Sequence, residues 1–487
     1  MSSIVGLQGK FKGNDIVKML KASKNRGPNA SGVYLDDVKL NIDLDEFSDD
    51  NEYDIAFGHN LLCVYDTNER QDLPQPVSND KLVLVFDGVL YNFRTIRNLV
   101  GKVGVEAEIK SDAEALLYLI DFYNKGDLLK AIQMAQRLIE GDYAFALWDG
   151  ENIAIVRDSL GVKPLFYSTN DDLKGFASDR QALTAVGFDE IETLKPEHIL
   201  FNWQDIAPAQ PIYEKIFEGD VAKIDKLLKL SVSKRVEELY EVGVIFSGGV
   251  DSSYLALLLR EISENIGLKL KLYAVGSEGT HDIEAAKYAA KFLNLDLEIC
   301  EITEDMIREA LPEVVKAIGD DNLMKVGVGL TAYFATKMVA QDGIKVAISG
   351  QGADELFGGY KRYLESFVND TLNYDIRTDI ANMYHVNLER DGACAMLNSV
   401  ELRLPFLDEN LVELALNIQD NKKIVSMHDD MRKSILRKLA FEEGLDYEIA
   451  YRPKKAAQYG SGINKILKRR VLKSFDMEEF IDSLKEN

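Results

Sequence analysis

The amino-acid sequence predicts a two-domain protein, with a layered α+β domain followed by an α/β domain built on a doubly wound parallel sheet. The chain has 487 residues, enough for about two to four domains. Short strand patterns separated by helical patterns fill the first two hundred residues, whereas strands alternate regularly with longer helices between Val242 and Ser349. The pattern loosens around Trp203 to Gly219, so we expect one domain at 1–210 and another at 211–487.

In the first half, apolar runs closed by Asp-Gly pairs predict strands that are packed on both faces or joined by tight turns. Two of them are Lys81–Phe86 and Tyr143–Trp148. Helical spacing of apolar residues predicts helices at Asp112–Tyr123 and Leu128–Ile139. We therefore expect sheets and helices in stacked layers.

In the second half, the alternation of strands and helices is the one that parallel sheets require, because each crossover needs a helix. From about Ile380 onward the pattern is mostly helical. The expected strands are Val242–Phe246, Lys269–Val275, Leu297–Ile302 and Lys345–Ser349, and the expected helices are Ala222–Tyr240, Ser252–Ile266, Asp282–Leu293, Glu304–Ile318 and Leu330–Ala340.

Charge and composition exclude several classes of protein. The 57 Lys and Arg against 81 Asp and Glu give a formal net charge of −24, so neither nucleic acid nor an anionic membrane is an expected partner. The three cysteines form no C-x-x-C pair and the five histidines no H-E-x-x-H motif, which argues against a disulfide framework or a zinc site. No stretch of ~18 consecutive apolar residues and no signal-peptide pattern occur, so we expect a cytoplasmic protein.

The segment Val242–Ser253 carries the most informative motif, a strand followed by S-G-G-x-D-S-S and a helix. Free backbone N–H groups and the positive end of the helix dipole then point at one place, which is an arrangement that binds phosphate. Gly248 and Gly249 allow the tight turn, and Asp251 can hold a divalent cation. An ordinary strand-to-helix turn is the alternative, but the complete run favours phosphate binding.

A second segment, Ser349–Tyr360, also follows a strand and combines a glycine turn with acids, so it predicts a second phosphate and metal loop. It is not a Walker A loop, because both Gly-Lys pairs of the sequence are followed by Phe or Val and not by Ser or Thr. Gly350-Gln351-Gly352 also lacks the third glycine of a dinucleotide-binding motif.

The S-G-G-x-D-S-S run resembles the pyrophosphate loop of the ATP pyrophosphatase superfamily, whose members cleave ATP between the α and β phosphates. Together with Ser349–Tyr360, Ser399–Asp408 and the Y-R-P-K-K run that starts at Tyr451, it is similar to the synthetase domain of glutamine-hydrolysing asparagine synthetases. This resemblance extends from about Val242 to Ile463 and implies ATP and Mg²⁺. It implies a pyrophosphate cradle of Ser247, Gly248, Gly249, Asp251 and Ser252, Mg²⁺ ligands Asp251 and Asp354, and adenosine contacts from Phe246, Val275, Ser349 and Gly350.

Three further residues are expected to take part in the chemistry. Lys454, in the family-like R-P-K run, is the candidate cation for the charge that develops on the α-phosphate. Asparagine synthetases resembling this chain have Glu or Gln at the position of Gln351, whereas β-lactam synthetases have Tyr, so Gln351 argues against lactam formation. An amide does not titrate, so Glu355 or another acid would have to take a proton from ammonia.

The first half resembles the glutaminase domain of the same family, which implies an N-terminal nucleophile fold with two stacked sheets between helices. The family's nucleophile is a cysteine exposed by removal of Met1, but this position is Ser2. The family's substrate-binding Arg, oxyanion-hole Asn and neighbouring Glu are matched by Asn60, Asp87 and Val89, and an acid at Asp87 opposes an oxyanion. The positions that keep the family's identity are Gly88 and Asp112, so the sequence predicts an inactive glutaminase.

The predicted reaction is ATP-dependent amidation of aspartate through an acyl-adenylate, giving asparagine, AMP and pyrophosphate. The nitrogen would come from free ammonia or from a separate glutaminase. One alternative is an amide ligase of the same fold that acts on another carboxylate, including ring closure. Another is a degenerate homologue that serves as a regulatory subunit, and a homodimer also stays open.

Overall fold

The computed structural model describes the chain except for Met1, Val103, Glu106, Phe217, Glu218, Glu278, 454–461, Ser474, Glu478 and 480–487. The chain divides into two compact units, Met1–Ala209 and Gln210–Asn487, called the N-terminal and C-terminal units below. None of the helices in the described parts combines the length and the apolar character needed to cross a bilayer.

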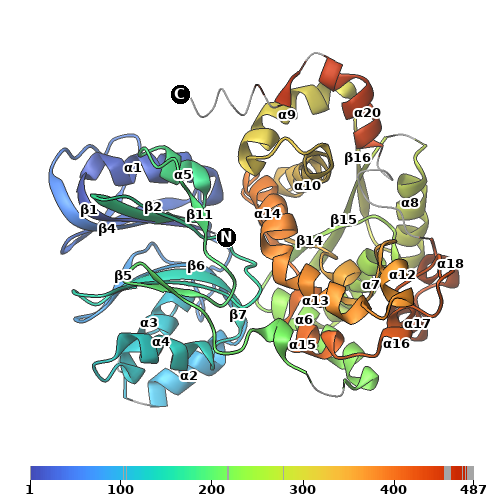
Figure 1. Ribbon diagram of the computed structural model, residues 1–487, viewed down its shortest axis with the longest axis horizontal. Helices are drawn as coiled ribbons and strands as arrows, with labels where there is room; N and C mark the ends of the chain where they lie inside the picture. The colour runs from blue at the N-terminus through green and yellow to red at the C-terminus, as the bar shows by residue number, and fades with distance from the viewer. Residues whose placement is uncertain are drawn as a thin grey trace. The chain divides into compact units, whose positions relative to one another are not determined.

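Two antiparallel sheets form the middle of the N-terminal unit (Figure 1). The first has the strand order β11-β9-β10-β1-β4-β2-β3 and the second the order β13-β12-β8-β7-β6-β5. The strands are β1 (Ser3–Lys12), β2 (Ala30–Leu35), β3 (Val38–Ile42), β4 (Glu52–Leu61), β5 (Val77–Ser78), β6 (Val83–Leu90), β7 (Gly141–Trp148), β8 (Ile153–Arg157), β9 (Phe166–Thr169), β10 (Leu173–Ala177), β11 (Glu192–Thr193), β12 (Ile199–Phe201) and β13 (Gln204–Ile206).

Helices cover the outer face of each sheet, so the unit has helix, sheet, sheet and helix layers (Figure 1). The helices α1 (Gly13–Ala22) and α5 (Arg180–Thr184) lie on the first sheet. On the second sheet lie α2 (Phe93–Lys102), α3 (Asp112–Tyr123) and α4 (Leu128–Gln136). This is the N-terminal nucleophile architecture that the sequence predicts.

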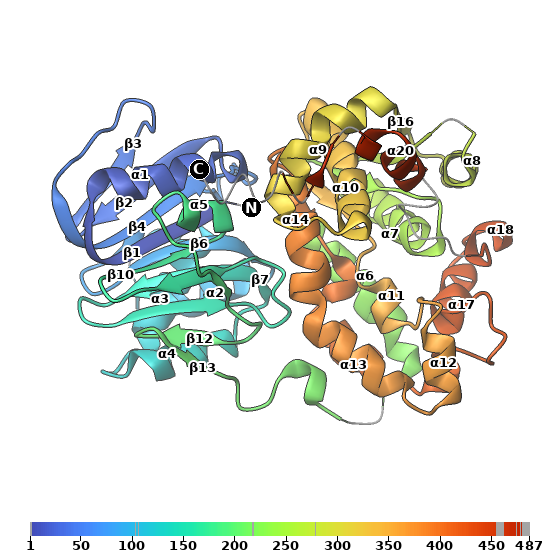
Figure 2. The same cartoon turned by 45° about the horizontal axis from the view of Figure 1, so that its top comes forward.

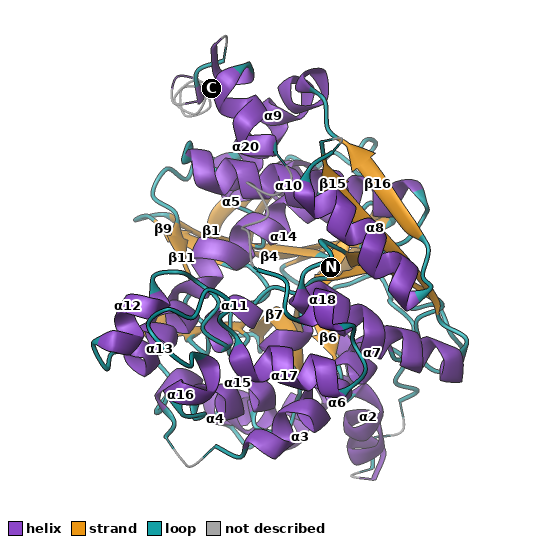
Figure 3. Cartoon of the chain, turned by 90° about the vertical axis from the view of Figure 1, so that its right-hand side faces the viewer, coloured by secondary structure: helices purple, strands orange, loops and turns teal. Residues whose placement is uncertain are grey.

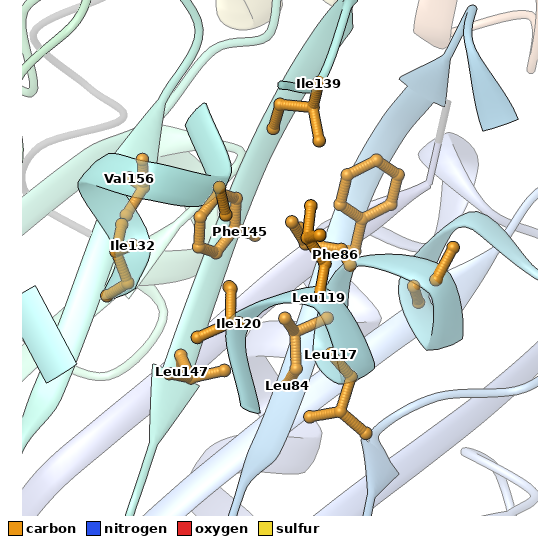
Figure 4. Close-up of a cluster of buried hydrophobic side chains, with 14 of the residues drawn as sticks. Leu84, Phe86, Leu117, Leu119, Ile120, Ile132, Ile139, Phe145, Leu147 and Val156 are labelled. Atoms are coloured by element: carbon orange, nitrogen blue, oxygen red, sulfur yellow. The ribbon is translucent and has the colours of Figure 1, made fainter. Parts of the chain in front are cut away.

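Apolar side chains fill each interface between layers. One core cluster joins the second sheet to α3 and α4, with Phe86 and Phe145 from the sheet facing Leu119 and Ile120 from α3 (Figure 4). Another cluster lies between the two sheets and includes Phe57. Burial of such side chains stabilises each layer by about 25 cal/mol per Å² of apolar surface.

Five parallel strands form the sheet of the C-terminal unit, in the order β16-β15-β14-β17-β18. Consecutive strands run outward in one direction from β14 and then in the other direction from β17, so the sheet is doubly wound and its order reverses between β14 and β17. The strands are β14 (Glu241–Ile245), β15 (Lys269–Gly276), β16 (Leu297–Glu301), β17 (Val346–Ile348) and β18 (Glu401–Arg403).

Helices surround this sheet, and α8 lies beside β15 and β16 in Figure 3. Helices α13 and α14 form one continuous column, seen in orange in Figure 2, because a π turn at Tyr384–Leu388 joins them. The helices are α6 (Ile224–Val236), α7 (Val250–Ile266), α8 (His281–Leu293), α9 (Glu304–Ile318), α10 (Leu323–Gln341), α11 (Ala353–Leu356), α12 (Tyr363–Val368), α13 (Leu372–Met383), α14 (Glu389–Met396), α15 (Glu409–Leu416), α16 (Asp420–Lys423), α17 (Ser434–Glu442), α18 (Tyr447–Ala450) and α20 (Ile463–Arg469).

The largest differences from the sequence prediction are in two elements, while β6 continues through Asp87-Gly88 to Leu90 and α6 ends earlier than expected, at Val236. Helix α10 begins at Leu323 and not at Leu330, because the Asn322 side chain accepts hydrogen bonds from the first turn and caps the helix. Its first half contains glycines, which hide the helical pattern in the sequence but allow close packing. A Cβ atom on Gly329 would lie 2.9 Å from the Cys394 Sγ atom. Strand β18 falls in the part expected to be helical, because three residues are too few for a visible alternation of apolar side chains.

Candidate active site

A cavity of the C-terminal unit lies at the point where the strand order reverses. In doubly wound sheets, this point leaves a crevice outside the carboxyl ends of the two central strands. The loops after β14 and β17 both line this cavity, whose volume is about 570 Å³. Of the residues expected to bind ATP or metal or to act in catalysis, the structure brings together Phe246, Ser247, Gly249, Asp251, Ser252, Val275, Ser349, Gly350, Gln351, Asp354 and Glu355.

The loop after β14 owes its shape to Gly248. This residue has a φ of +65°, and a Cβ atom there would lie 2.5 Å from the carbonyl carbon of Ala285 in α8. Gly248 therefore packs against α8, while Gly249 next to it serves as the N-cap of α7 and makes no side-chain cap. The Ser247 N–H donates to the Ser252 Oγ at 3.2 Å, which closes the loop. The first turn of α7 thus presents its backbone N–H groups and its positive dipole end to the cavity.

Lys433 joins the two acids that the sequence assigns to the metal. Its Nζ atom lies 2.5 Å from Asp251 Oδ2 and 2.6 Å from Asp354 Oδ1, and its side chain is 1% exposed. Burial opposes the charge, but the two carboxylates outweigh it and raise the pKa of Lys433, so it is a cation at neutral pH. Sequence reasoning missed Lys433 because it belongs to no glycine-rich run. Its φ of +54°, which is unusual for a lysine, is seen only in the structure.

Gly359 makes room for this ion pair. A Cβ atom on it would lie 1.9 Å from Asp354 Oδ1 and 2.3 Å from Lys433 Cε. The second glycine of the F-G-G-Y run therefore allows the backbone to pass directly beside the charged groups.

The donor set fits a magnesium ion that is held partly by substrate phosphate. Asp251 Oδ1 is buried and has no hydrogen-bond partner, so one hard oxygen is available beside the Lys433 contact. Mg²⁺ prefers such oxygens and is usually bound by one or two carboxylates together with phosphate and water. Within the described residues no group of three or more His, Cys, Asp or Glu side chains forms a closed metal cage.

Glu355 follows Asp354 in the chain and is a buried acid, 3% exposed. The Tyr360 hydroxyl and the Asn387 Nδ2 atom both donate to its Oε1, at 2.6 and 2.8 Å. Burial and the nearby carboxylates raise the pKa of Tyr360 far above its ordinary value, so its hydroxyl stays a donor. Neither partner of Glu355 was singled out from the sequence, since they lie 5 and 32 positions away along the chain.

Lys454 lies outside the described residues, but Arg452 of the same run lines the cavity. The Arg452 guanidinium donates to the Ser247 carbonyl at 3.3 Å and pairs with Asp282 at 2.8 Å. The R-P-K run therefore starts at the S-G-G loop.

In the N-terminal unit, Asp87 is completely buried and surrounded by donors. The Ser2 backbone N–H donates to its Oδ1 at 3.0 Å, and the Ser178 hydroxyl donates to its Oδ2 at 3.3 Å. The Arg26 guanidinium lies 3.7 Å from the same Oδ2 and is also buried. Asp87 thus belongs to an internal ion pair beside Ser2.

The other expected glutaminase positions also have internal partners or are apolar. Asn60 donates to the Ser3 hydroxyl at 3.0 Å and to the Leu20 carbonyl at 2.9 Å. Asp112 accepts two hydrogen bonds from the Arg70 guanidinium, at 3.1 and 2.6 Å, and one from the Leu90 N–H at 2.8 Å. Val89 is 1% exposed, and a Cβ atom on Gly88 would lie 2.4 Å from the Asp142 carbonyl oxygen.

Comparison with known proteins covers both units. Residues 223–377 and 368–483 match the model for asparagine synthase, and residues 1–234 match the model for a glutamine amidotransferase domain. A Methanocaldococcus jannaschii protein, provisionally assigned as glutamine-hydrolysing asparagine synthetase 1, is 35% identical over 100% of this chain and 98% of its own length. Asparagine synthetase B of Escherichia coli K12 is 26% identical over 92% of this chain and 79% of its own length. The chain therefore belongs to the asparagine synthase family of ATP-dependent ligases.

Proposed function

We propose that the chain converts aspartate, ATP and ammonia to asparagine, AMP and pyrophosphate. The observation that carries this proposal is the joining of two glycine-rich loops at the reversal of strand order, with Asp251, Asp354 and Lys433 in contact between them. Two acids and a cation in this place suit a Mg²⁺-bound pyrophosphate. The two relatives described above are named asparagine synthetases of the glutamine-hydrolysing type, which supports the synthetase half of the proposal.

In the first step, the aspartate side-chain carboxylate attacks the α-phosphorus, a P–O bond forms, and the α–β bond breaks to release pyrophosphate. Backbone N–H groups at the start of α7 and the Ser247 and Ser252 hydroxyls would hold the pyrophosphate, as they line the cavity. Mg²⁺ on Asp251 and Asp354 would supply neutralising charge. Lys433 keeps the acids in place, and Lys454 is the proposed cation for the α-phosphate.

In the second step, ammonia attacks the acyl carbon and AMP leaves. Gln351 offers only a neutral amide here, so the proton of the attacking nitrogen needs another acceptor. Glu355 lines the same cavity and is the proposed base.

The N-terminal unit is proposed to be inactive as a glutaminase. An acid at Asp87 would repel an oxyanion, and the Arg70 guanidinium already neutralises Asp112, the acid that the family retains. If Met1 is removed, the new amine of Ser2 would face the Asp87 carboxylate, which favours the protonated amine over the base that a nucleophile needs. Ammonia would then come from solution or from a separate glutaminase, in the cytoplasm.

The test is release of AMP and pyrophosphate by the purified full-length chain with Mg²⁺ and ATP. Aspartate, glutamate and other acids are each paired with ammonium or with glutamine. Asparagine formed from aspartate and ammonium, with none from glutamine, supports the proposal. Release of AMP and pyrophosphate with a different acid would identify that acid as the substrate in place of aspartate. No release with any acid would support a regulatory homologue. Glutamine hydrolysis at a rate comparable to ammonium use would refute the inactive glutaminase.

A further inference from the structure

Glu355 is held by a part of the C-terminal unit that belongs to neither glycine-rich loop. The column formed by α13, the π turn Tyr384–Leu388 and α14 borders the cavity along its length. A π turn is rare and often occurs at a functional site. The residues of this column that line the cavity are spaced alternately three positions and one position apart, and they are Asp379, Asn382, Met383, Val386, Asn387 and Arg390.

The π turn delivers Asn387 to the buried acid. Its Nδ2 atom lies 2.8 Å from Glu355 Oε1. An ionised carboxylate only accepts, so the amide nitrogen must be the atom that faces it. The Tyr360 hydroxyl reaches the same oxygen at 2.6 Å from the loop after α11. Two donors from two separate elements therefore converge on one oxygen of Glu355.

Tyr360 is itself fixed in place. The Arg362 guanidinium lies over its ring at 4.5 Å from the centroid, and Arg362 pairs with Asp379 of α13 at 2.5 Å. The ring cannot turn away from Glu355 without losing this stacking. The α13–α14 column thus restrains Glu355 twice, directly through Asn387 and indirectly through Asp379, Arg362 and Tyr360.

We propose that Asn387 and Tyr360 are positioning residues that orient Glu355 as the base for the attacking ammonia. This rests on the function proposed above. Two donors from separate elements on one oxygen fix the orientation of the carboxylate in the cavity, and a base must have a defined orientation to take a proton from the attacking nitrogen. The nitrogen forms a bond to the acyl carbon, the bond from that carbon to the AMP oxygen breaks with its electron pair, and one nitrogen proton passes to Glu355 and then to solvent.

The test uses Asn387→Asp, which keeps the shape but removes the donor, and Tyr360→Phe, which removes only the hydroxyl. Each full-length variant is assayed with aspartate, ATP and Mg²⁺ and with either ammonium or hydroxylamine as nucleophile. The nitrogen of a hydroxylamine adduct is much more acidic than that of an ammonia adduct, so it loses its proton with less help from a base. We expect kcat with ammonium to fall at least about tenfold, because a positioned base contributes at least that much. Hydroxamate formation and the aspartate KM should change little.

Matched controls are Asn265→Asp and Tyr288→Phe, which alter exposed side chains of α7 and α8 with other partners. Both should leave the ratio of amide to hydroxamate unchanged. An equal loss with both nucleophiles would mean that the two residues only support the fold, and unchanged ammonium rates would mean that they do not orient Glu355. Either result overturns the inference while the proposed function stands. If Asn387→Asp does not fold, Tyr360→Phe decides alone, and absence of AMP release by the parent chain refutes both.

Discussion

At the scale of single residues, the contact of Lys433 with Asp251 and Asp354 is the most consequential in the C-terminal unit. Two carboxylates that face each other repel, and each would lose ionisation without a cation between them. Lys433 provides that cation from a backbone of left-handed conformation, which few lysines adopt. The residue therefore serves both the stability of the unit and the shape of the cavity.

Lys433→Met should leave two partly buried acids without their cation. We expect a loss of about 3 kcal/mol in the free energy of unfolding, at the low end for a broken buried pair because both acids remain 23% exposed. Urea unfolding of the full chain measures this loss. Lys438→Met is the control, since its Nζ pairs with Glu442 at the surface at 3.7 Å. Equal stability of the two variants would contradict the prediction.

At the scale of elements, the loop after β14 packs directly against helix α8. This contact positions Gly249, where helix α7 begins. The contact is between backbones, so it depends on the absence of a side chain at Gly248. A substitution there changes the distance between two elements and not merely one side chain.

Gly248→Ala should weaken ATP binding, because the added Cβ atom pushes α8 away from the loop and the φ of +65° costs about 1 kcal/mol or more. Titration of ATP with Mg²⁺ by calorimetry measures the change. Gly267→Ala at the C-terminal end of the same helix is the control, as it has a φ of +72° but nothing within 4 Å of its Cβ position. It should lose stability and keep ATP affinity; similar affinity losses in both variants would argue against the contact with α8.

Sequence patterns predicted elements best where they are long and periodic. Helix α3 has the predicted bounds Asp112–Tyr123, because Ser111 and Glu114 form a capping box at its start. Both glycine-rich loops followed strands as expected. Lys433 and Asn387 could not be predicted, since long-range packing brings them to the acids and each lies in a segment without a recognisable motif. Tyr360 ends the predicted second loop, but nothing in the pattern marked its contact with Glu355.

At the scale of the whole molecule, each unit has its own core and its own ionisable groups. Metal and nucleotide would act on the C-terminal unit, whereas a buried histidine makes the N-terminal unit sensitive to acid. The two units are therefore expected to respond to different changes in solution conditions.

ATP with Mg²⁺ should raise the melting temperature of the C-terminal unit, and EDTA should abolish this effect. At 100 times the dissociation constant, a ligand stabilises by about 2.7 kcal/mol, which differential scanning calorimetry resolves. Asp251→Asn should respond weakly to ATP even with Mg²⁺. Full stabilisation by ATP in EDTA would show that the two acids bind no metal.

Acid should destabilise the N-terminal unit through His59, whose burial lowers its pKa from 6.5 to about 3. The unfolded chain then binds a proton that the folded unit does not, so stability falls as the pH drops below 6.5. From pH 7 to pH 5 this histidine removes about 2 kcal/mol. Asp158 acts in the opposite sense, because burial raises its pKa to about 6.

A comparison of variants isolates the histidine. The loss between pH 7 and pH 5, measured by denaturant unfolding, should shrink by about 2 kcal/mol in His59→Asn. His428→Asn changes an exposed histidine of the other unit and should retain the full pH dependence. A parent-like pH dependence in His59→Asn would rule out this origin of acid sensitivity.

The π turn at Tyr384–Leu388 sets the number of residues between α13 and α14. This number decides which side chains of the two helices border the same cavity. A π turn contains one residue more than an α-helical turn, and each residue of an α-helix rotates the chain by about 100°. Deleting one residue here would restore a regular helix, but it would rotate α14 relative to α13. Asp379 and Arg390 would then no longer border one cavity. A single-codon deletion in this segment is therefore expected to do more damage than most substitutions in it.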